Sequence, residues 1–503
     1  MKSFVYGIDG GDREIFEYFQ QQMPFYQKLT QSHIHLNLHE DLLHRGWSEI
    51  ITGATGEETG GFYMSPDLDG SANFSMKYKM AEVPDKTGIQ LLWDALPSGI
   101  KVGAMNIPSL MPVSKVNGFC VGSAGAGISK VDEITSDLAF PDTVKDFLNK
   151  EKYIPDIRIG PSGIKDMDEL FRRLKEMESK RVNCYIKLAQ EHEVDFGLLI
   201  DRATTVVQYL FRSEIQALMD RDDGKQPLFP PTRKVEKLLK DFYAFVDENI
   251  KLLFEEFHAK QFLVVSDHGH APMTHHCNIN AILFDSGFYF PSSGGYRSNE
   301  FKIKLLIKKI KRFIKRAIPA SVLANILNSF LGKAKKIVSV NIKDEFDKEK
   351  TLAFSNWYMP GIYINDSRFF GAVKEEERKS LVKKICDVIN EHPDSVTHGV
   401  TAEPYREYFS GSKYNEKLPD IRLKMPDYIF AAKDVSSYIE KNPKYGPVPN
   451  LFVVDSDMHS GTKSSAALCL VDGETAAMIK EEDALNLTIV NKLVRRFFDM
   501  ENK

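Results

Sequence analysis

The sequence has few cysteines and no long hydrophobic run. Its five cysteines are far apart and form no Cys-X-X-Cys pair, which argues against a disulfide framework or a zinc ribbon and indicates reduced thiols. No run of about 18 apolar residues occurs, as a membrane-spanning helix would need. The first three residues lead directly into an apolar strand, without the stretch of roughly 7 to 15 apolar residues that an export signal needs. We therefore expect a cytoplasmic protein.

The charge is nearly balanced. The net charge of −4 gives no bulk positive charge, so the composition indicates no nucleic-acid partner. With 43% hydrophobic and 27% charged residues, the chain has the composition of a globular protein. Its 503 residues allow two or three domains, or one large α/β core with an insertion.

Short apolar runs alternate with amphipathic stretches along the chain. This alternation predicts a mostly parallel central sheet with helices on both faces, since strands separated by helices pair in parallel. The predicted strands are Phe4–Ile8, Lys101–Asn106, Phe196–Ile200, Gln261–Val265, Gly361–Ile364 and Ala466–Val471. The clearest predicted helices are Met167–Ala189 and Thr232–His258, whose apolar residues recur at helical spacing.

A basic segment interrupts this pattern. Residues 302–316 contain eight Lys or Arg and no acid, with an apolar stripe at helical spacing, and Pro319 ends the helix before a second one. We assign 291–352 to a basic helical insertion, or cap, on a core made of 1–290 and 353–503. The stripe is explained by packing against the core or over the mouth of a site. Contact of 302–316 with an anionic membrane surface is the alternative.

Two strands end in residues that suit metal binding. Phe262–Val265 leads to Asp267-His268-Gly269, and Phe4–Ile8 leads to Asp9. Ligands of α/β sheets bind at the carboxyl ends of strands, and zinc-type ions take oxygen and nitrogen ligands. Asp9, Asp267 and His268 are therefore predicted metal ligands. For Asp9 the alternative is a helix cap near Arg13.

These segments resemble the type I phosphodiesterase and nucleotide pyrophosphatase family of the alkaline phosphatase superfamily, over nearly the whole chain. The resemblance is carried by the motifs in order and spacing. They are Asp9 after the first strand, Trp47 before Thr52-Gly53 and Gly60, Lys101 to Pro108, Val116 to Phe119, Asp267-His268-Gly269, Asn280 and Gly361 to Asn365. It implies an alkaline phosphatase-like α/β core with a helical insertion.

The resemblance also implies a two-metal site, usually with zinc, and a Thr or Ser nucleophile bound to one metal. The first metal set corresponds to Asp9, Asp267 and His268. The nucleophile lies nine residues before Thr-Gly in the family, and that position is Leu43 here. Three ligand positions of the second metal correspond to Thr205, Tyr209 and Lys463, where the family has Asp, His and His.

Some residues could restore the missing groups. Asp201 or His459 could replace ligands through a shifted alignment, and Ser48, Thr52 or Thr55 could supply a hydroxyl nucleophile. His270, His275 and His276 near Asp267, and His44 beside Leu43, are either polar loop residues or new ligands. Lys463 is either a solvated lysine or an ammonium that partly replaces the charge of the second metal.

Two function classes follow. One is a metal-dependent hydrolase of phosphodiesters, pyrophosphates or other phosphate esters with a degenerate or rearranged site. The other is a non-catalytic family member, a pseudoenzyme, that keeps one metal or anion pocket for binding or scaffolding. We expect one divalent metal (zinc, or manganese or magnesium), no normal second metal, and an anionic small molecule or phosphate ester as ligand.

Overall fold

The computed structural model describes residues 1–39, 41–123, 133–157, 166–292, 346–356, 359–432, 437–448 and 459–501. The predicted helices at 301–337, including the basic stretch 302–316, lie outside the described residues, as does most of the predicted insertion 291–352. Within the described ranges, no helix combines the length and the apolar character needed to cross a membrane. All five cysteines are buried and unpaired.

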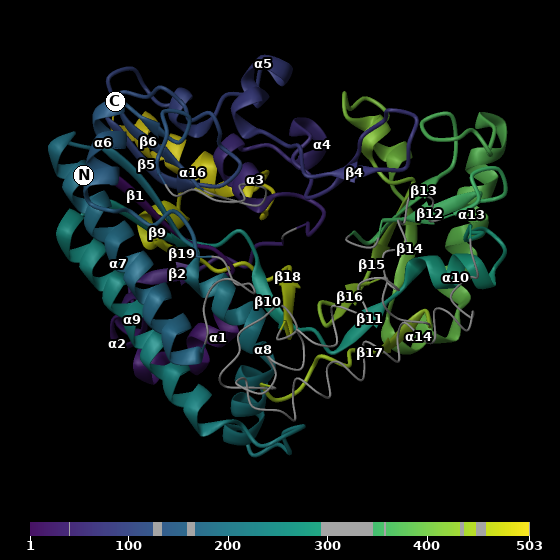
Figure 1. The fold of residues 1–503 in the computed structure, drawn as a ribbon. Helices are drawn as coiled ribbons and strands as arrows, with labels where there is room; N and C mark the ends of the chain where they lie inside the picture. The colour runs from purple at the N-terminus through teal and green to yellow at the C-terminus, as the bar shows by residue number, and fades with distance from the viewer. Residues whose placement is uncertain are drawn as a thin grey trace, which may run out of the picture.

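A central sheet of eight strands organises the chain (Figure 1). Its order is β2 (His33–His35), β19 (Cys469–Asp472), β9 (Gln261–Val265), β1 (Ser3–Ile8), β8 (Phe196–Asp201), β5 (Val102–Ile107), β6 (Gly118–Gly122) and β7 (Ala139–Phe140). The strands from β9 to β6 pair in parallel, whereas β19 and β7 pair antiparallel with their neighbours. A mostly parallel sheet was predicted, and this is confirmed.

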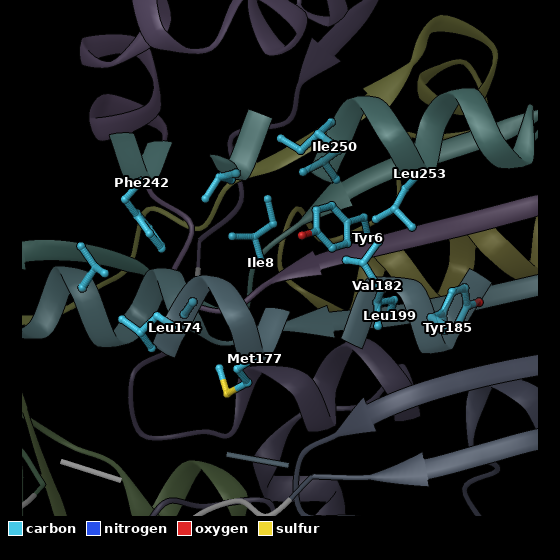
Figure 2. Packing of buried hydrophobic residues seen from close by; sticks show 14 of the residues in the cluster. Tyr6, Ile8, Leu174, Met177, Val182, Tyr185, Leu199, Phe242, Ile250 and Leu253 are labelled. Atoms are coloured by element: carbon cyan, nitrogen blue, oxygen red, sulfur yellow. The ribbon is translucent and has the colours of Figure 1, made fainter. Parts of the chain in front are cut away.

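Helices cover both faces of this sheet because successive strand residues point to opposite sides. From β1, Tyr6 and Ile8 pack under α7 (Met167–Glu191) and α9 (Arg233–Phe257), as Figure 2 shows. Val5 faces the other side, in a second cluster with α3 (Gly46–Thr52) and α16 (Thr488–Glu501). Each fully buried apolar side chain contributes roughly 1.5–3 kcal/mol. The helices α7 and α9 are the two that the sequence predicts, and their ends lie within about two residues of the expected ones.

Apart from the helices of the smaller part described below, the other helices of the described residues are short, except α8 (Ala203–Asp222), which follows β8. They are α1 (Arg13–Tyr18), α2 (Pro24–Leu29), α4 (Gly56–Thr59), α5 (Val83–Thr87), α6 (Asp142–Lys150) and α15 (Gly473–Ala476). In the part of the chain that the structure describes, two separate two-stranded antiparallel pairs also lie outside the main sheet. They are β3 (Ser65–Pro66) with β4 (Phe74–Ser75), and β10 (Gly269–Pro272) with β18 (Gly461–Ser464).

A smaller part of the chain has its own hydrophobic cluster, to one side of the main sheet in Figure 1. Its described residues form a four-stranded sheet, a three-stranded sheet and three helices. These are β12 (Ala353–Ser355), β13 (Gly361–Ile364), β15 (Ile421–Lys424) and β14 (Thr401–Pro404); β16 (Ile429–Ala431), β11 (His275–Cys277) and β17 (Ile439–Lys441); and α10 (Ile279–Asp285), α13 (Glu375–Glu391) and α14 (Pro393–His398). The predicted strand Gly361–Ile364 thus forms, but in this smaller part and not in the central sheet.

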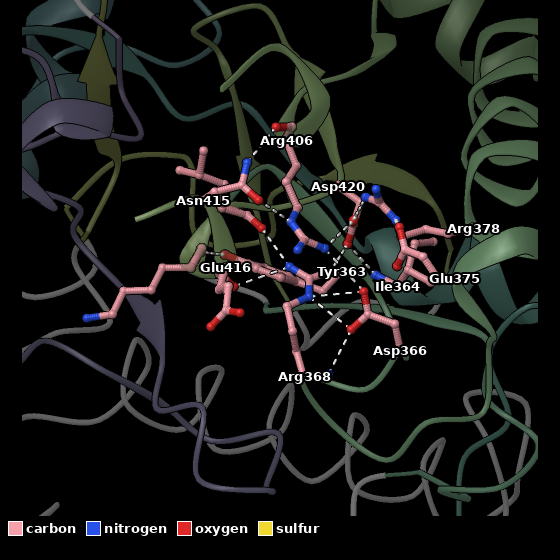
Figure 3. Close-up of polar contacts among 12 residues, drawn as sticks. Tyr363, Ile364, Asp366, Arg368, Glu375, Arg378, Arg406, Asn415, Glu416 and Asp420 are labelled. Atoms are coloured by element: carbon pink, nitrogen blue, oxygen red, sulfur yellow. Dashed lines mark hydrogen bonds and ion pairs between the residues drawn. The ribbon is translucent and has the colours of Figure 1, made fainter. Parts of the chain in front are cut away.

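Buried charges hold the smaller part together (Figure 3). Asp420 has no exposed side-chain surface, and its carboxylate accepts hydrogen bonds from Arg378 at 3.1 Å and from the Ile364 amide at 2.8 Å. Arg368 forms ion pairs with Asp420 and with Asp366, the latter at 2.9 Å. Each carboxylate therefore has cationic partners, which compensates the cost of burial.

Candidate metal and anion site

Three of the predicted residues meet at the carboxyl edge of the central sheet. Asp9 follows β1, and Asp267 and His268 follow β9, its parallel neighbour. Their ligand atoms lie within 4.8 Å of one another, and all three residues are buried. His268 Nε2 is 3.6 Å from Asp267 Oδ2 and 3.9 Å from Asp9 Oδ1. Adjacent parallel strands bring their ends together, which explains the convergence.

Hydrogen bonds orient the three side chains. Trp47 Nε1 donates to Asp9 Oδ2 at 3.0 Å, and the Gly10 amide donates to Asp267 Oδ1 at 3.3 Å. His268 Nδ1 lies 2.8 Å from the Gly269 carbonyl, so this nitrogen is the donor and Nε2 faces the carboxylates with its lone pair.

The donor set fits a divalent cation. Metal–ligand bonds of about 2.0–2.2 Å place neighbouring ligand atoms about 3.3–3.6 Å apart in a tetrahedron, close to the observed separations. Burial and the nearby Asp9 raise the pKa of Asp267 to about 8, and burial with Lys463 lowers the pKa of His268 to about 3. The imidazole is therefore neutral, and a cation between the two carboxylates would remove their repulsion.

The structure brings Thr205, Tyr209 and Lys463 to the same cavity. This cavity has a volume of about 680 Å³ and is lined by all three residues together with Asp9, Asp267 and His268. Thr205 and Tyr209 belong to α8, which begins directly after β8. Lys463 lies on β18 opposite His270 of β10. Thr205 Oγ1 is 3.0 Å from His270 Nε2.

Lys463 supplies positive charge to the cavity. Its ammonium hydrogen-bonds to the Tyr63 hydroxyl and lies 3.6 Å from the centroid of that ring. Its charge acts on both neighbours of the predicted metal, since it lowers the pKa values of Asp267 and His268. The position that the resemblance assigned to a histidine thus holds an ammonium that faces the site.

Solved structures with the same architecture support this arrangement of the sheet. Phosphonoacetate hydrolase from Sinorhizobium meliloti 1021 in complex with phosphonoacetate aligns with a TM-score of 0.51 at 12% identity, over 99% of this chain and 96% of that chain. Its complex with phosphonoformate aligns with a TM-score of 0.50 at 11% identity over the same shares. The chain has an alkaline phosphatase-like fold. The resemblance stated from the sequence is confirmed at that level.

Other comparisons are weaker. The murine ectonucleotide pyrophosphatase/phosphodiesterase 5 in complex with AMP, an inactive form, aligns with a TM-score of 0.45 at 11% identity, over 99% of this chain and 95% of that chain. No protein-family model and no curated protein sequence matches the chain.

Within the alkaline phosphatase-like fold, the predicted hydroxyl nucleophiles differ in position. Ser48 lines the cavity, and its Oγ is 2.5 Å from the Tyr78 hydroxyl. Thr52 is buried away from the cavity, with Oγ1 donating to the Ser48 carbonyl at 2.7 Å. Thr55 caps α4. Leu43, which the resemblance aligns with the nucleophile, does not line the cavity. It packs in a small cluster with Phe62, Met64, Met359, Tyr405 and Leu418.

The residues that could have replaced lost ligands mostly point elsewhere. The Asp201 carboxylate accepts hydrogen bonds from Tyr6 at 3.1 Å and from the Ala203 amide at 2.7 Å, so it faces away from the cavity. His459 is exposed and stacks on Tyr209, with ring centroids 5.7 Å apart. His270 contacts Thr205 and lies 5.1 Å, ring to ring, from His268.

Two of the predicted loop histidines and the motif residue Asn280 belong to the smaller part of the chain. His275 and His276 lie on β11, between β16 and β17, and are not among the described residues that line the cavity. Asn280 exchanges hydrogen bonds with the backbone of Ser355 on β12, at 2.9 and 2.7 Å. That role is structural.

Several cavity residues were not predicted. Arg45 Nε donates to the Phe62 carbonyl at 2.9 Å, and the guanidinium stacks on the rings of Tyr63 and Tyr78. Arg202 pairs with Asp156 at 3.0 Å. Arg202 could have been predicted, because it directly follows the end of a strand at Asp201. The position of Tyr63 depends on loop packing and could not be predicted in this way.

Proposed function

We propose that the chain is a metal-dependent phosphoester hydrolase of the type I phosphodiesterase and nucleotide pyrophosphatase class with a rearranged site. In this site Asp9, Asp267 and His268 hold one divalent ion, and Lys463 contributes the positive charge of the missing second one. The observation that carries the proposal is the ammonium of Lys463 in the same cavity as these three residues. A phosphate or phosphonate group between the metal and Lys463 would meet positive charge on both sides.

A bound divalent ion would supply Lewis-acid polarisation of a phosphoryl oxygen. The chain's own groups do the rest. Lys463, Arg45 and Arg202 attract and orient an anionic substrate, and their charges stabilise the non-bridging oxygens. Tyr63 fixes the ammonium, and Trp47 fixes the Asp9 carboxylate. These contacts support recognition of a phosphate ester before any step of chemistry.

Hydrolysis by this site requires a nucleophile, and the position that the resemblance gives to it is a leucine. Among the hydroxyls considered, Ser48 is favoured because it lines the cavity, whereas Thr52 does not. Its hydroxyl would have to exchange the short hydrogen bond with Tyr78 for the substrate. Without an activated hydroxyl, metal and cations alone provide binding and a much smaller acceleration.

A non-catalytic role in binding or scaffolding is the second candidate. It is favoured by Leu43, which the resemblance aligns with the family's nucleophile and which packs into an apolar cluster. In this case the metal and Lys463 would hold an anion without cleaving it. The two candidates share the pocket and differ only in turnover.

One experiment tests the shared pocket and then separates the candidates. Full-length protein, Asp267→Asn, Lys463→Met and the exposed controls Asp499→Asn and Lys383→Met would be analysed for bound metal and for phosphonoacetate binding by calorimetry. We expect Asp267→Asn to lose the metal of this site and Lys463→Met to keep it while binding phosphonoacetate about tenfold or more weakly, the loss of a charge-assisted contact. Retention of that metal in Asp267→Asn would refute the pocket.

Hydrolysis of bis(p-nitrophenyl) phosphate and p-nitrophenyl phosphate then discriminates. Turnover that is lost in Asp267→Asn and reduced in Ser48→Ala would establish the hydrolase. Phosphonoacetate binding without turnover would establish the binding role. Two tightly held zinc ions at the Asp9 site would contradict both forms, because Thr and Tyr hydroxyls are poor neutral ligands.

A further inference from the structure

A second cluster of metal-binding side chains lies outside the cavity. Asp41, His44 and Glu57 offer ligand atoms that lie within 4.8 Å of one another. Asp41 and His44 precede α3, and Glu57 lies on α4. His44 and Glu57 are buried, and Asp41 is partly buried. None of the three lines the cavity described above, so this cluster is separate.

The orientation of His44 directs one nitrogen into the cluster. Its Nδ1 lies 2.7 Å from Glu49 Oε1, which fixes the proton of a neutral ring on that nitrogen. The opposite nitrogen, Nε2, is 3.2 Å from Glu57 Oε2 but makes no hydrogen bond of acceptable geometry with any described residue. The side chain is only 4% exposed, so water does not readily reach Nε2. A carboxylate behind a histidine is the usual support of a metal-binding imidazole.

The spacing also fits a small divalent ion. Nitrogen and oxygen ligands bound at about 2.0–2.2 Å lie about 3.3–3.6 Å apart around a tetrahedral ion. The separation of 3.2 Å between His44 Nε2 and Glu57 Oε2 is close to this edge length. Glu57 is fixed by the Tyr405 hydroxyl, and Asp41 Oδ1 accepts the Leu43 amide at 3.0 Å, so neither carboxylate is free to swing away.

The charges of the cluster leave room for a cation. Asp41, Glu49 and Glu57 contribute three carboxylates, and Arg422 pairs with Asp41. A proton on His44 would leave this set one charge short of neutral, whereas a divalent ion beside a neutral imidazole would balance it. The competing explanation is an imidazolium held between Glu49 and Glu57: burial lowers the pKa of His44, but its contacts with these two carboxylates raise that pKa well above its ordinary value.

We propose that Asp41, His44 and Glu57 bind a structural divalent cation of zinc type, independent of the cavity site. The contacts around the cluster indicate its role. Tyr405 and Arg422 come from the smaller part of the chain, and Ser412 Oγ donates to the Glu57 carbonyl at 2.5 Å. The ion would therefore stabilise the contact between the segment before α3 and the smaller part, beside the cluster that buries Leu43.

Metal counting in matched variants tests this assignment. Full-length wild type, Asp267→Asn, Glu57→Gln, the double variant and the exposed control Glu376→Gln would be stripped with chelator, loaded with zinc, desalted and analysed for metal. We expect two ions per chain in wild type and Glu376→Gln, one in each single site variant, and none in the double variant. Because Asp267→Asn removes only the cavity site, its remaining ion reports on this cluster alone.

Two measurements keep the test decisive if Glu57→Gln folds poorly. In the Asp267→Asn background, zinc should raise the melting temperature, and cobalt should give the visible absorption of a four-coordinate ion. Adding Glu57→Gln should abolish both responses. A folded Asp267→Asn protein that retains no zinc and shows no zinc-dependent shift would overturn the proposal and establish the imidazolium. If Asp267→Asn binds no zinc, the proposed cavity site is unaffected, because that site needs the Asp267 carboxylate, which this variant lacks.

Discussion

Asp420 and Asp267 are both buried carboxylates, but their surroundings differ. Asp420 in the smaller part receives hydrogen bonds or ion pairs from Arg368, Arg378 and a backbone amide (Figure 3). Asp267 at the edge of the central sheet faces a second carboxylate, Asp9, and a neutral imidazole, with the Gly10 amide as donor and Lys463 acting through space. Burial with full compensation is typical of structure, and burial without it is typical of a site that receives a ligand.

The largest effect is expected at Asp420. Replacing it with Ala leaves arginine charges buried without their partner and should lower the free energy of unfolding by about 3–5 kcal/mol. Denaturant titration of the variant beside the exposed control Asp499→Asn measures this. A decrease in the free energy of unfolding below about 1 kcal/mol would show that the arginines find other partners. Asp420 would then not differ from Asp267 as a structurally required carboxylate.

The opposite sign is expected at Asp267. In metal-free protein, Asp267→Asn removes an ionisable group that burial and Asp9 disfavour, and it should raise the free energy of unfolding by about 1–3 kcal/mol. In the presence of zinc the order should reverse, because only the wild type gains the energy of the bound ion. Melting temperatures with chelator and with zinc check both statements, and a destabilised variant in chelator would contradict the first.

The pH dependence sharpens this point. The pKa of Asp267 is about 8 in the folded chain, against 3.8 for the ordinary group, so the folded state holds the proton more tightly. The contribution of this proton to the free energy of unfolding is therefore fully present below pH 4 and is lost as the pH rises through 8. Above that pH the free energy of unfolding no longer changes on account of Asp267. The stability of metal-free wild type relative to Asp267→Asn should fall across this window. A difference that does not change between pH 4 and 9 would exclude the raised pKa.

The smallest effect is expected at Lys463. Its ammonium favours the ionised form of Asp267, so Lys463→Met should raise the pKa of Asp267 further and lower the stability of metal-free protein by less than about 1 kcal/mol near pH 8. Repeating the pH series in this variant shows the shift. A midpoint that moves down instead would mean that Lys463 acts on the site through other contacts.

Much of the fold could be predicted because it depends on local pattern. The strands leading to Asp9 and Asp267 are continuous apolar runs, and the ends of neighbouring parallel strands must meet. Leu43 could be singled out from the family resemblance, but its burial could not be predicted, since the cluster around it uses Met359 and Leu418 from far along the chain. Tyr63 was missed for the same reason, because its partner Lys463 lies far away in the sequence. Gly361–Ile364 has the pattern of a strand, but periodicity does not say which sheet a strand joins.

The pairing of β10 with β18 has a consequence for how this cavity can change. His270 stands opposite Lys463 and Ala271 opposite Thr462, and residues opposite each other share a face of the ribbon. A single inserted or deleted residue in β18 before Lys463 would exchange these faces and turn the ammonium out of the cavity, without a substitution at any residue that lines it. The charge beside Asp267 is thus encoded in an alignment of two short strands as much as in the identity of residue 463. A one-residue indel is therefore a short mutational route between a site that favours anions and one that does not.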